Sequence, residues 1–326
     1  MNCILMIGLG SIGKRHLDNL VYLGYNNIII VSKYCTIPSE YNQFSVYTDI
    51  QKAIDVNSIS HGFICTPTSN HLDDLKILLE NNIANIYMEK PISHSLNQLD
   101  EISGLINQCK RLVVGYDLHF DPGLMKIKKL LNGNQMGKLF SINAVVGQYL
   151  PDWRPDQDYL KGMSARIDKG GGVLLDLVHE FDYVRWLVGE PKNIACVFQN
   201  NPNLAIETED VADVLIHFEG NSSATIHLDY HQKKLVRNCM ITCEKGTIFW
   251  DLTQCEVKII RYDQEEELFS YLGFERNQRY IDSIKTFLDE SEFDYRLTNF
   301  EEALVSLKMV VAAKKSSISK QFIAIN

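Results

Sequence analysis

The stretch Asn2-Cys-Ile-Leu-Met-Ile-Gly-Leu-Gly-Ser-Ile-Gly-Lys-Arg-His16 decides the fold of the first part of the chain. An apolar run of strand length leads into a Gly-x-Gly-x-x-Gly pattern, and a segment with helical character follows. In a dinucleotide-binding turn the first glycine permits the tight turn, the second lets backbone approach a pyrophosphate, and the third lets helix and strand pack closely. The start of the helix then attracts phosphate charge. The alternative is a glycine-rich turn that binds nothing. The pattern predicts a dinucleotide site at Gly8, Gly10, Ser11, Ile12 and Gly13.

Composition narrows the class of protein. The 326 residues are 45% hydrophobic and 22% charged, which is typical of a soluble globular protein with two domains. A net charge of −9 argues against nucleic acid and against an anionic membrane surface as partners. We expect no membrane span, because no apolar run reaches the roughly 20 residues that a span needs. Without a leader pattern, and with eight scattered cysteines, we expect a reducing cytoplasm, and no metal because zinc-ligand spacing is absent.

In the first third of the chain, short apolar runs alternate with segments of helical periodicity. Alternation of apolar runs with helical periods indicates a parallel sheet wound on both faces by helices, and we assign it to residues 1–118. In such a sheet, ligands bind at the carboxyl ends of the strands. The expected strands are 2–7, 27–32, 61–65, 84–88 and 111–115, and the expected helices are 12–23, 70–82 and 95–109.

From about residue 137 the pattern changes to consecutive strands joined by short turns. This predicts an α+β domain over residues 119–326 with a large, mostly antiparallel open sheet. Because an open sheet face often forms a subunit interface, we expect a homodimer or homotetramer built on it. The expected strands are 138–149, 193–199, 211–218, 224–232, 238–244 and 247–252, followed by helices 276–290 and 300–316.

Two segments at predicted strand ends bear on the cofactor. The second strand ends in Ser32 and Lys33, where an acidic residue would be usual for NAD. A hydroxyl and an ammonium suit a 2′-phosphate, so the sequence favours NADP over NAD; the alternative is a solvated loop lysine. After the third of these expected strands come Thr66 and Pro67, with His71 at the start of the next helix. We interpret this loop as covering the cofactor with His71 facing it, or else as an ordinary strand-to-helix loop.

Two further segments carry candidate chemistry. Glu89-Lys90-Pro91 follows the fourth of these strands, where Lys90 could donate to a substrate oxygen and Pro91 could make a cis bond; the alternative is an exposed lysine. A predicted helix opens after Gly170 and ends at Gly189. At 100° per residue it places Asp176 and His179 on one polar face, where the carboxylate could orient the imidazole as proton acceptor. The alternative is a helix that turns its polar face to water.

Together these motifs resemble the Gfo/Idh/MocA oxidoreductases, the family of glucose–fructose oxidoreductase and inositol dehydrogenase. The resemblance rests on the glycine turn, Cys65-Thr-Pro67 with His71, Glu89-Lys-Pro91, Gly115-Tyr116 with a later proline, and the helix from Gly170 to His179. It implies a Rossmann domain followed by an open-sheet domain that forms a dimer or tetramer, with a catalytic Lys90 and a proton-relaying Asp176 and His179. One departure is that family members commonly place this Asp and His four residues apart, whereas here they are three apart.

The segment from Val146 to Arg166 resembles a sub-group near the enzymes of surface-polysaccharide and legionaminic-type sugar biosynthesis. Its aromatic faces suit sugar CH surfaces, and its arginines could grip a carboxylate or a phosphate, so a nucleotide-linked or acidic sugar is indicated. The alternative is a packed loop with a structural tryptophan. The substrate-binding residues expected here and after the fifth of those strands are Tyr116, Tyr149, Trp153, Arg154, Tyr159 and Arg166.

The sequence therefore predicts a sugar dehydrogenase or reductase that transfers a hydride between a carbinol or keto carbon and the nicotinamide of NAD or NADP. Expected cofactor contacts include Thr66, Pro67, His71, Glu89 and Lys90. Two alternatives stay open. One is an epimerase-like or lyase-like enzyme that keeps NAD tightly bound and oxidises its substrate transiently. The other is a non-catalytic protein that senses NAD(P) and regulates a partner, because fold alone does not fix function.

Overall fold

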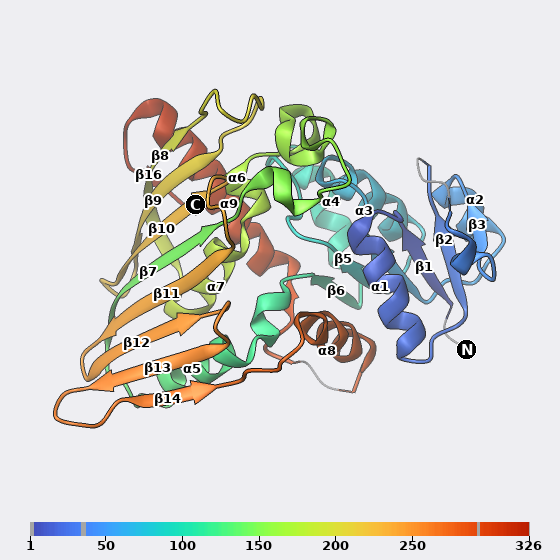
Figure 1. Ribbon diagram of the computed structural model, residues 1–326. Helices are drawn as coiled ribbons and strands as arrows, with labels where there is room; N and C mark the ends of the chain where they lie inside the picture. The colour runs from blue at the N-terminus through green and yellow to red at the C-terminus, as the bar shows by residue number, and fades with distance from the viewer. Residues whose placement is uncertain (1–2, 34–36, 292–293, 326) are drawn as a thin grey trace. The chain divides into compact units, whose positions relative to one another are not determined.

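The computed structural model describes residues 3–33, 37–291 and 294–325 (Figure 1). The chain forms two compact units. The first contains residues 1–117 with 276–304, and the second contains 118–275 with 305–326. The predicted division near residue 118 lies at the same place as the first change of unit. Residues 276–304, which the sequence analysis placed in the second domain, pack with the first unit.

The first unit is built on a seven-stranded sheet in the order β15-β6-β5-β4-β1-β2-β3. All neighbouring strands are parallel except β15, which runs antiparallel to β6. The four strands β1, β2, β4 and β5 are buried along their whole length, as expected for a parallel sheet covered by helices on both faces. This confirms the predicted doubly wound sheet. The strands are β1 (Ile4–Ile7), β2 (Ile28–Val31), β3 (Ser45–Tyr47), β4 (His61–Ile64), β5 (Asn85–Met88), β6 (Arg111–Val114) and β15 (Thr298–Asn299).

The helices of this unit mostly follow the predicted periodicity. The short strand β3 and helix α2 were not predicted, because a three-residue, largely exposed edge strand leaves no apolar run to detect. Helix α8 packs against α1, and Asn19 and Asn277 exchange side-chain hydrogen bonds of 3.3 and 2.7 Å between them. The α-helices are α1 (Ser11–Tyr22), α2 (Ile50–Asp55), α3 (His71–Glu80), α4 (Leu99–Ile106) and α8 (Arg276–Leu288).

The second unit is built on a nine-stranded sheet in the order β14-β13-β12-β11-β7-β10-β9-β8-β16 (Figure 1). Only β7 and β10 pair in parallel, so the predicted mostly antiparallel sheet is confirmed. The last three strands in chain order lie outside the predicted set. The strands are β7 (Leu139–Gly147), β8 (Pro191–Gln199), β9 (Val211–Phe218), β10 (Ser223–Asp229), β11 (Val236–Cys243), β12 (Gly246–Asp251), β13 (Glu256–Arg261), β14 (Glu267–Ser270) and β16 (Ile323–Ala324).

Helices cover one face of this sheet: α5 packs on β12 and β13, and α7 packs on β7 and β10. The strands alternate buried and more exposed residues, as in an antiparallel sheet with one uncovered face. The register places Val197, Leu215 and Phe249 on that uncovered face, where each is more than one-third exposed. The helices are α5 (Pro122–Asn132), α6 (Val173–Asp176), α7 (His179–Val188) and α9 (Phe300–Ser319), the last of which begins in the first unit.

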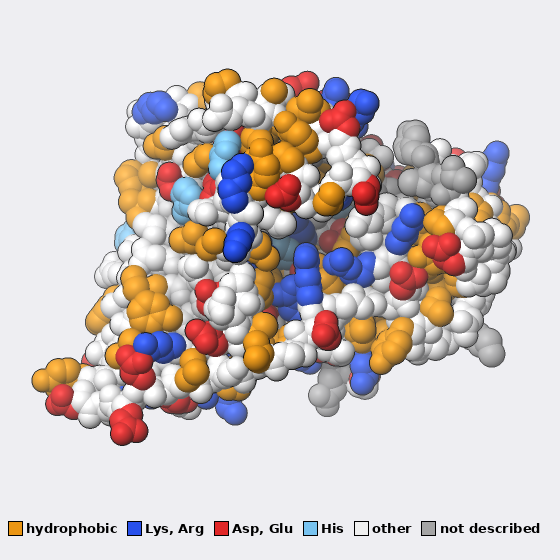
Figure 2. Space-filling model, in the orientation of Figure 1, with side chains coloured by type: hydrophobic (Ala, Val, Ile, Leu, Met, Phe, Trp, Pro, Cys, Tyr) orange, Lys and Arg blue, Asp and Glu red, His pale blue; other side chains and the backbone are white. Residues whose placement is uncertain are grey.

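The edge strand β14 carries charges. Glu267 lies 3.1 Å from Arg261 and 3.4 Å from Lys126. Around β13 and β14, at the lower left of Figure 2, acidic and basic side chains are interspersed with hydrophobic ones. Charged side chains on an edge strand disfavour pairing with another chain. None of the helices in the described part of the chain is long and apolar enough to cross a membrane.

Candidate functional site

The glycine turn after β1 forms a cradle at the start of α1. Gly8 has φ +92°, and a Cβ there would come 2.7 Å from the Cys65 carbonyl oxygen. A Cβ on Gly13 would collide with the carbonyl oxygen of Gly8. At Gly10, the N-cap of α1, an added Cβ would meet no atom within 4 Å, and no side chain caps the helix. Open space beside uncapped helix amides is what a pyrophosphate requires, so these residues fit a dinucleotide.

A lysine at the end of β2 lies near a buried carboxylate on α3. Ser32 is buried and Lys33 is exposed. Nearby on α3, Asp74 is buried and accepts a 2.6 Å hydrogen bond from the Thr66 hydroxyl. Burial raises the pKa of Asp74, and the Thr66 hydrogen bond and the Lys33 charge oppose that rise. A carboxylate therefore acts electrostatically on the lysine that was predicted to select a 2′-phosphate.

His71 does not face outward toward a ligand. Its side chain is buried, with Nδ1 2.7 Å from the carbonyl oxygen of Pro91 and Nε2 2.9 Å from that of Thr66. Burial lowers the pKa of His71, and the two carbonyls oppose that effect. Because backbone oxygens occupy both ring nitrogens, the predicted contact of this imidazole with the cofactor is corrected: His71 joins two strand-to-helix loops.

The Glu89-Lys-Pro91 segment leaves the carboxyl end of β5, two strands from β1 in the same sheet. The Lys90–Pro91 bond is cis, which the sequence analysis had named as one option for Pro91. Lys90 is partly exposed, whereas the carboxylate of Glu89 is buried and lies 2.6 Å from His16 Nε2 on α1. The Glu89 carboxylate is therefore turned toward the body of the helix, and the contact of Glu89 with the cofactor stays a prediction.

The end of β6 also turns inward. Tyr116, a predicted substrate contact, is only 2% exposed. The neighbouring Gly115 leaves room for a carboxylate, since a Cβ there would come 2.8 Å from Glu89 Oε1. The contact of Tyr116 with a substrate stays a prediction.

In the second unit, the predicted single helix from Gly170 is interrupted. Helix α6 ends at Asp176 and α7 begins at His179, because Leu177 leaves helical geometry with φ −99° and ψ 32°. The argument that helical spacing puts Asp176 and His179 on one face is therefore wrong. The alternative of a helix that turns its polar face to water is also wrong, since Asp176 and His179 are buried, as are Glu180 and Tyr183 on the same segment.

The two buried carboxylates, Asp176 and Glu180, are paired with residues far along the chain. The Tyr230 hydroxyl, directly after β10, donates a 2.7 Å hydrogen bond to Asp176 Oδ2. Burial raises the pKa of Tyr230, and the Asp176 charge adds to the rise. Arg237 on β11 lies 2.9 Å from the Glu180 carboxylate. Sequence analysis missed Tyr230, because it treated residues 224–232 as one strand; the signal was a tyrosine among titratable residues at a strand's end.

The loop before α6 uses several of its predicted substrate groups locally. Trp153 donates its Nε1 to the Gln148 carbonyl oxygen at 3.1 Å and lies edge-on to Tyr230, with ring centroids 5.3 Å apart. The Tyr159 hydroxyl donates to the Leu204 carbonyl oxygen at 3.0 Å. Trp153 and Tyr159 therefore fix the conformation of this loop. Trp153 also packs against Tyr230, whose hydroxyl donates to Asp176.

Of the loop's cations, Arg166 is already matched, with two nitrogens 3.0 and 3.2 Å from the Asp168 carboxylate. Arg154 is exposed. Lys233 brings a further charge, with its Nζ 3.1 Å from the centroid of the Tyr149 ring. The roles of Arg154 and Arg166 in gripping a substrate stay a prediction, and Lys233 is a cation that the sequence analysis did not name.

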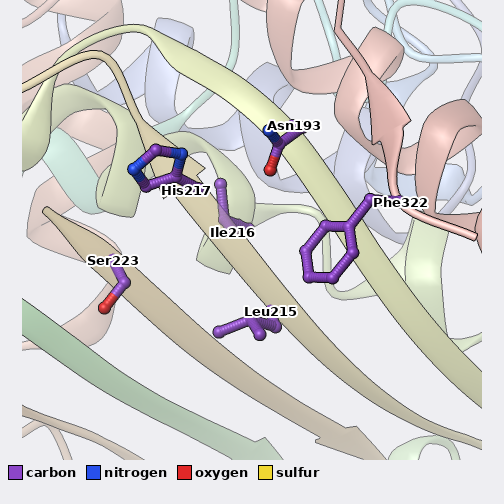
Figure 3. A pocket seen from close by; sticks show the side chains of 6 residues that line it. All are labelled: Asn193, Leu215, Ile216, His217, Ser223 and Phe322. Carbon is purple, nitrogen blue, oxygen red and sulfur yellow. The ribbon is translucent and has the colours of Figure 1, made fainter. Parts of the chain in front are cut away.

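A separate shallow pocket of about 530 Å³ lies on the uncovered sheet face (Figure 3). It contains none of the predicted site residues. Within the described residues, no group of three or more His, Cys, Asp or Glu side chains is placed to hold a metal ion. The pocket is lined by Asn193, Leu215, Ile216, His217, Ser223 and Phe322.

Family models match both units. The model "Oxidoreductase family, NAD-binding Rossmann fold" matches residues 3–116, and the model "GFO/IDH/MocA C-terminal domain" matches residues 124–249. Together these matches cover well over half of the chain.

Individual proteins resemble the chain more distantly. An uncharacterized oxidoreductase, YrbE, of Bacillus subtilis (strain 168) is 28% identical over 238 residues, which cover 68% of this chain and 65% of that protein. A 2,7-anhydro-N-acetylneuraminate hydratase of Mediterraneibacter gnavus is 24% identical over 232 residues, covering 69% of this chain and 59% of the relative. The chain thus aligns with less than two thirds of either relative. A levoglucosan dehydrogenase in complex with NADH shares the fold, with a TM-score of 0.86, 16% identity and full coverage of both chains.

Proposed function

Because the chain belongs to the Gfo/Idh/MocA family of NAD-binding oxidoreductases, we propose that it is an NAD(P)-dependent sugar dehydrogenase or reductase. Its substrate would be a nucleotide-linked or acidic sugar, oxidised or reduced at one carbinol or keto carbon. We further propose that it works in the cytoplasm, in the biosynthesis of a surface glycan.

One observation carries the proposal. Lys90 and the glycine turn follow β5 and β1, which are parallel and separated only by β4. Their carboxyl ends therefore meet at the same edge of the sheet. An amine that leaves this edge beside a phosphate cradle is placed to act on a group next to the cofactor's reactive end.

The cofactor would be held by the glycine turn, the loop at Thr66 and Pro67, and the end of β2. When bound, it would supply the acceptor or donor of the hydride. Ser32 and Lys33 favour NADP, while the nearby Asp74 carboxylate works against a 2′-phosphate. We retain NADP as the preferred cofactor and NAD as the alternative.

Each proposed catalytic residue has one role. Lys90 would donate to the substrate oxygen and stabilise negative charge that develops on it. His179 would accept the proton from the substrate hydroxyl, or return it in the reductive direction. Asp176 would orient His179, while the hydrogen bond from Tyr230 fixes that carboxylate in place.

The substrate class rests on the loop before α6. Arg154 and Lys233 are cations suited to a carboxylate or phosphate, and the Tyr149 and Trp153 rings suit the apolar face of a sugar. Tyr159 and Arg166 would contribute through their parts not engaged with Leu204 and Asp168. The name of one relative, 2,7-anhydro-N-acetylneuraminate hydratase, includes an acidic sugar, which supports this class.

The uncovered face of the second sheet would form the subunit interface. It carries exposed apolar side chains at Val197, Leu215 and Phe249 and the shallow pocket of Figure 3. A closed dimer or tetramer would cover these side chains. Sedimentation velocity of the protein and of Leu215→Lys tests this: the variant should dissociate, and a monomeric wild type would overturn the proposal.

The experiment for the activity is a panel of neutral, uronic, nonulosonic and nucleotide-linked sugars with NAD⁺ and NADP⁺, followed by absorbance at 340 nm. We expect turnover with an acidic or nucleotide-linked sugar. Turnover confined to neutral free sugars would overturn the substrate class. No turnover with any sugar, despite dinucleotide binding, would favour a sensor of NAD(P).

A second candidate is an enzyme with a tightly held dinucleotide and no net oxidation. It is favoured by the relative named a hydratase, because adding or removing water changes no overall oxidation state. Product analysis by mass spectrometry, without added cofactor, distinguishes the two. Formation of an isomer or dehydrated sugar with no change at 340 nm supports the second candidate.

A further inference from the structure

Two buried histidines hold the segment that carries Lys90, one on each side of it. His16 Nε2 lies 2.6 Å from Oε1 of Glu89, the residue before the lysine. His71 Nδ1 lies 2.7 Å from the carbonyl oxygen of Pro91, the residue after it. Lys90 itself is partly exposed, so the chain is fixed on both sides of a side chain that reaches solvent.

The pair of His16 and Glu89 lies in an apolar, aromatic setting. The His16 side chain is fully buried, with ring centroids 6.2 Å from Phe63, 5.4 Å from Tyr87 and 6.0 Å from Tyr280. A carboxylate in such surroundings is costly unless it is paired. Glu89 therefore has a strong reason to keep its contact with His16.

The backbone around Glu89 is shaped for this contact. The Glu89 amide donates to the Ile64 carbonyl oxygen at 2.9 Å, which continues the ladder between β4 and β5. A side chain on Gly115 would come within 2.8 Å of Glu89 Oε1, so glycine there leaves the carboxylate its place. The carboxylate thus lies against His16, in the space that Gly115 leaves for it.

His71 acts on the other side. It is the first residue of α3, and its Nε2 also lies 2.9 Å from the Thr66 carbonyl oxygen in the loop after β4. One imidazole therefore links the Thr66 loop to the backbone just after Lys90. The cofactor was proposed to lie along that loop.

We propose that His16 and His71 are positioning residues that set the Lys90 amine relative to the dinucleotide cradle. Helix α1 begins at the glycine turn, where the pyrophosphate would bind, and it carries His16. The same helix therefore holds Glu89, the residue before Lys90. Neither histidine would touch substrate: His16 acts through the side chain of Glu89, and His71 acts through the backbone of Pro91. This inference rests on the proposed function, in which Lys90 acts beside a bound dinucleotide.

The test measures the reactivity of the Lys90 amine, which requires no known substrate. Protein is labelled sparingly with acetic anhydride, with and without NADH or NADPH, and Lys90 is quantified by mass spectrometry relative to the exposed Lys52. The variants are His16→Leu, His71→Leu and His16→Gln, the last of which keeps an N–H donor for Glu89. The matched control is His61→Leu, a histidine 1% exposed at the amino end of β4.

We expect the two leucine variants at positions 16 and 71 to change Lys90 labelling severalfold in the free protein and to lose most of its protection by dinucleotide. His16→Gln should restore the wild-type pattern, and His61→Leu should keep it even where it lowers the melting temperature. Wild-type labelling and protection in His16→Leu and His71→Leu would overturn the proposal, because their role would then be structural only.

If His16→Leu does not fold because Glu89 is left unpaired, the double variant His16→Leu/Glu89→Gln removes the unpaired charge and the same changes are expected. If dinucleotide fails to protect Lys90 in the wild type, the proposed cofactor site is contradicted. The comparison of free proteins then still decides the positioning role, since a changed labelling rate supports it and an unchanged rate overturns it.

Discussion

The two units position their candidate residues in different ways. In the first, the glycine turn, the Thr66 loop and Lys90 each follow a buried parallel strand directly. In the second, Asp176 is held by Tyr230, 54 residues further on, and Glu180 is paired with Arg237, 57 residues further on. A parallel sheet gathers its site from short motifs at strand ends, whereas the helix-covered antiparallel sheet assembles its site from distant residues.

The largest effect should come from Lys90→Met. Turnover should fall by about 100-fold to 1,000-fold, because a donor to the developing charge is lost. Calorimetric affinity for NADH should stay close to that of the wild type. Lys52→Met, at an exposed lysine on α2, is the control and should change neither. Unchanged turnover in Lys90→Met would show that Lys90 is not a catalytic residue.

Two glycines of the same turn should separate stability from binding. Gly13→Ala should lower the free energy of unfolding by about 3 kcal/mol, because its Cβ would collide with the Gly8 carbonyl. Gly10→Ala should fold normally, since its Cβ has open space and its φ is −73°, yet it should weaken NADH binding severalfold. Urea unfolding and calorimetry measure both. Normal NADH affinity in Gly10→Ala would place the pyrophosphate elsewhere.

Tyr230→Phe tests the assembled site of the second unit. Removing the donor from buried Asp176 should cost about 1–3 kcal/mol of unfolding free energy. If Asp176 also serves catalysis, kcat should fall more than KM rises. Tyr271→Phe is the control for stability alone; it loses a 3.2 Å bond to the Asp121 carboxylate and the hydroxyl that accepts a 2.9 Å bond from Trp250. Equal kinetics in the two variants would reduce Tyr230 to a structural residue.

The smallest effect should appear on the uncovered sheet face. His227 lies 2.7 Å from Asp213 and 3.3 Å from Asp229. The Asp229 hydrogen bond, helped by Asp213, raises the pKa of His227 to about 9. Because the folded pKa exceeds the unfolded value of about 6.5, its stabilisation is complete below pH 6.5 and is lost as pH rises through 9.

The free energy of unfolding, measured in urea from pH 6 to pH 9.5, should therefore decline more steeply in the wild type than in His227→Gln. Partial exposure keeps the difference small. Parallel curves for the two proteins would show that the carboxylates do not act on His227 as the geometry indicates.

Sequence was sufficient where chemistry is local. The Gly8–Gly13 turn and the change from parallel to antiparallel sheet both follow from neighbouring residues. It was insufficient where a side chain's direction depends on a distant partner. Nothing near Glu89 indicates that α1 supplies His16.

The break between Asp176 and His179 shows the limit in another way. The residues between them are Leu177 and Val178, which suit a helix, and the apolar period continues through them. Tertiary contacts override that local preference, for Val173 donates to the Glu209 carbonyl and Tyr230 holds Asp176. The spacing of apolar residues along the sequence carries no information about such tertiary contacts.

The most direct test of the central claim is a calorimetric titration of the purified protein with NADPH and with NADH. The account predicts saturable binding of both at one site per chain, tighter for NADPH because of Ser32 and Lys33. Tighter NADH binding would contradict the 2′-phosphate assignment and indicate that Asp74 dominates that end of the site. If neither dinucleotide binds, the proposed cofactor site is contradicted, and with it the role of Lys90.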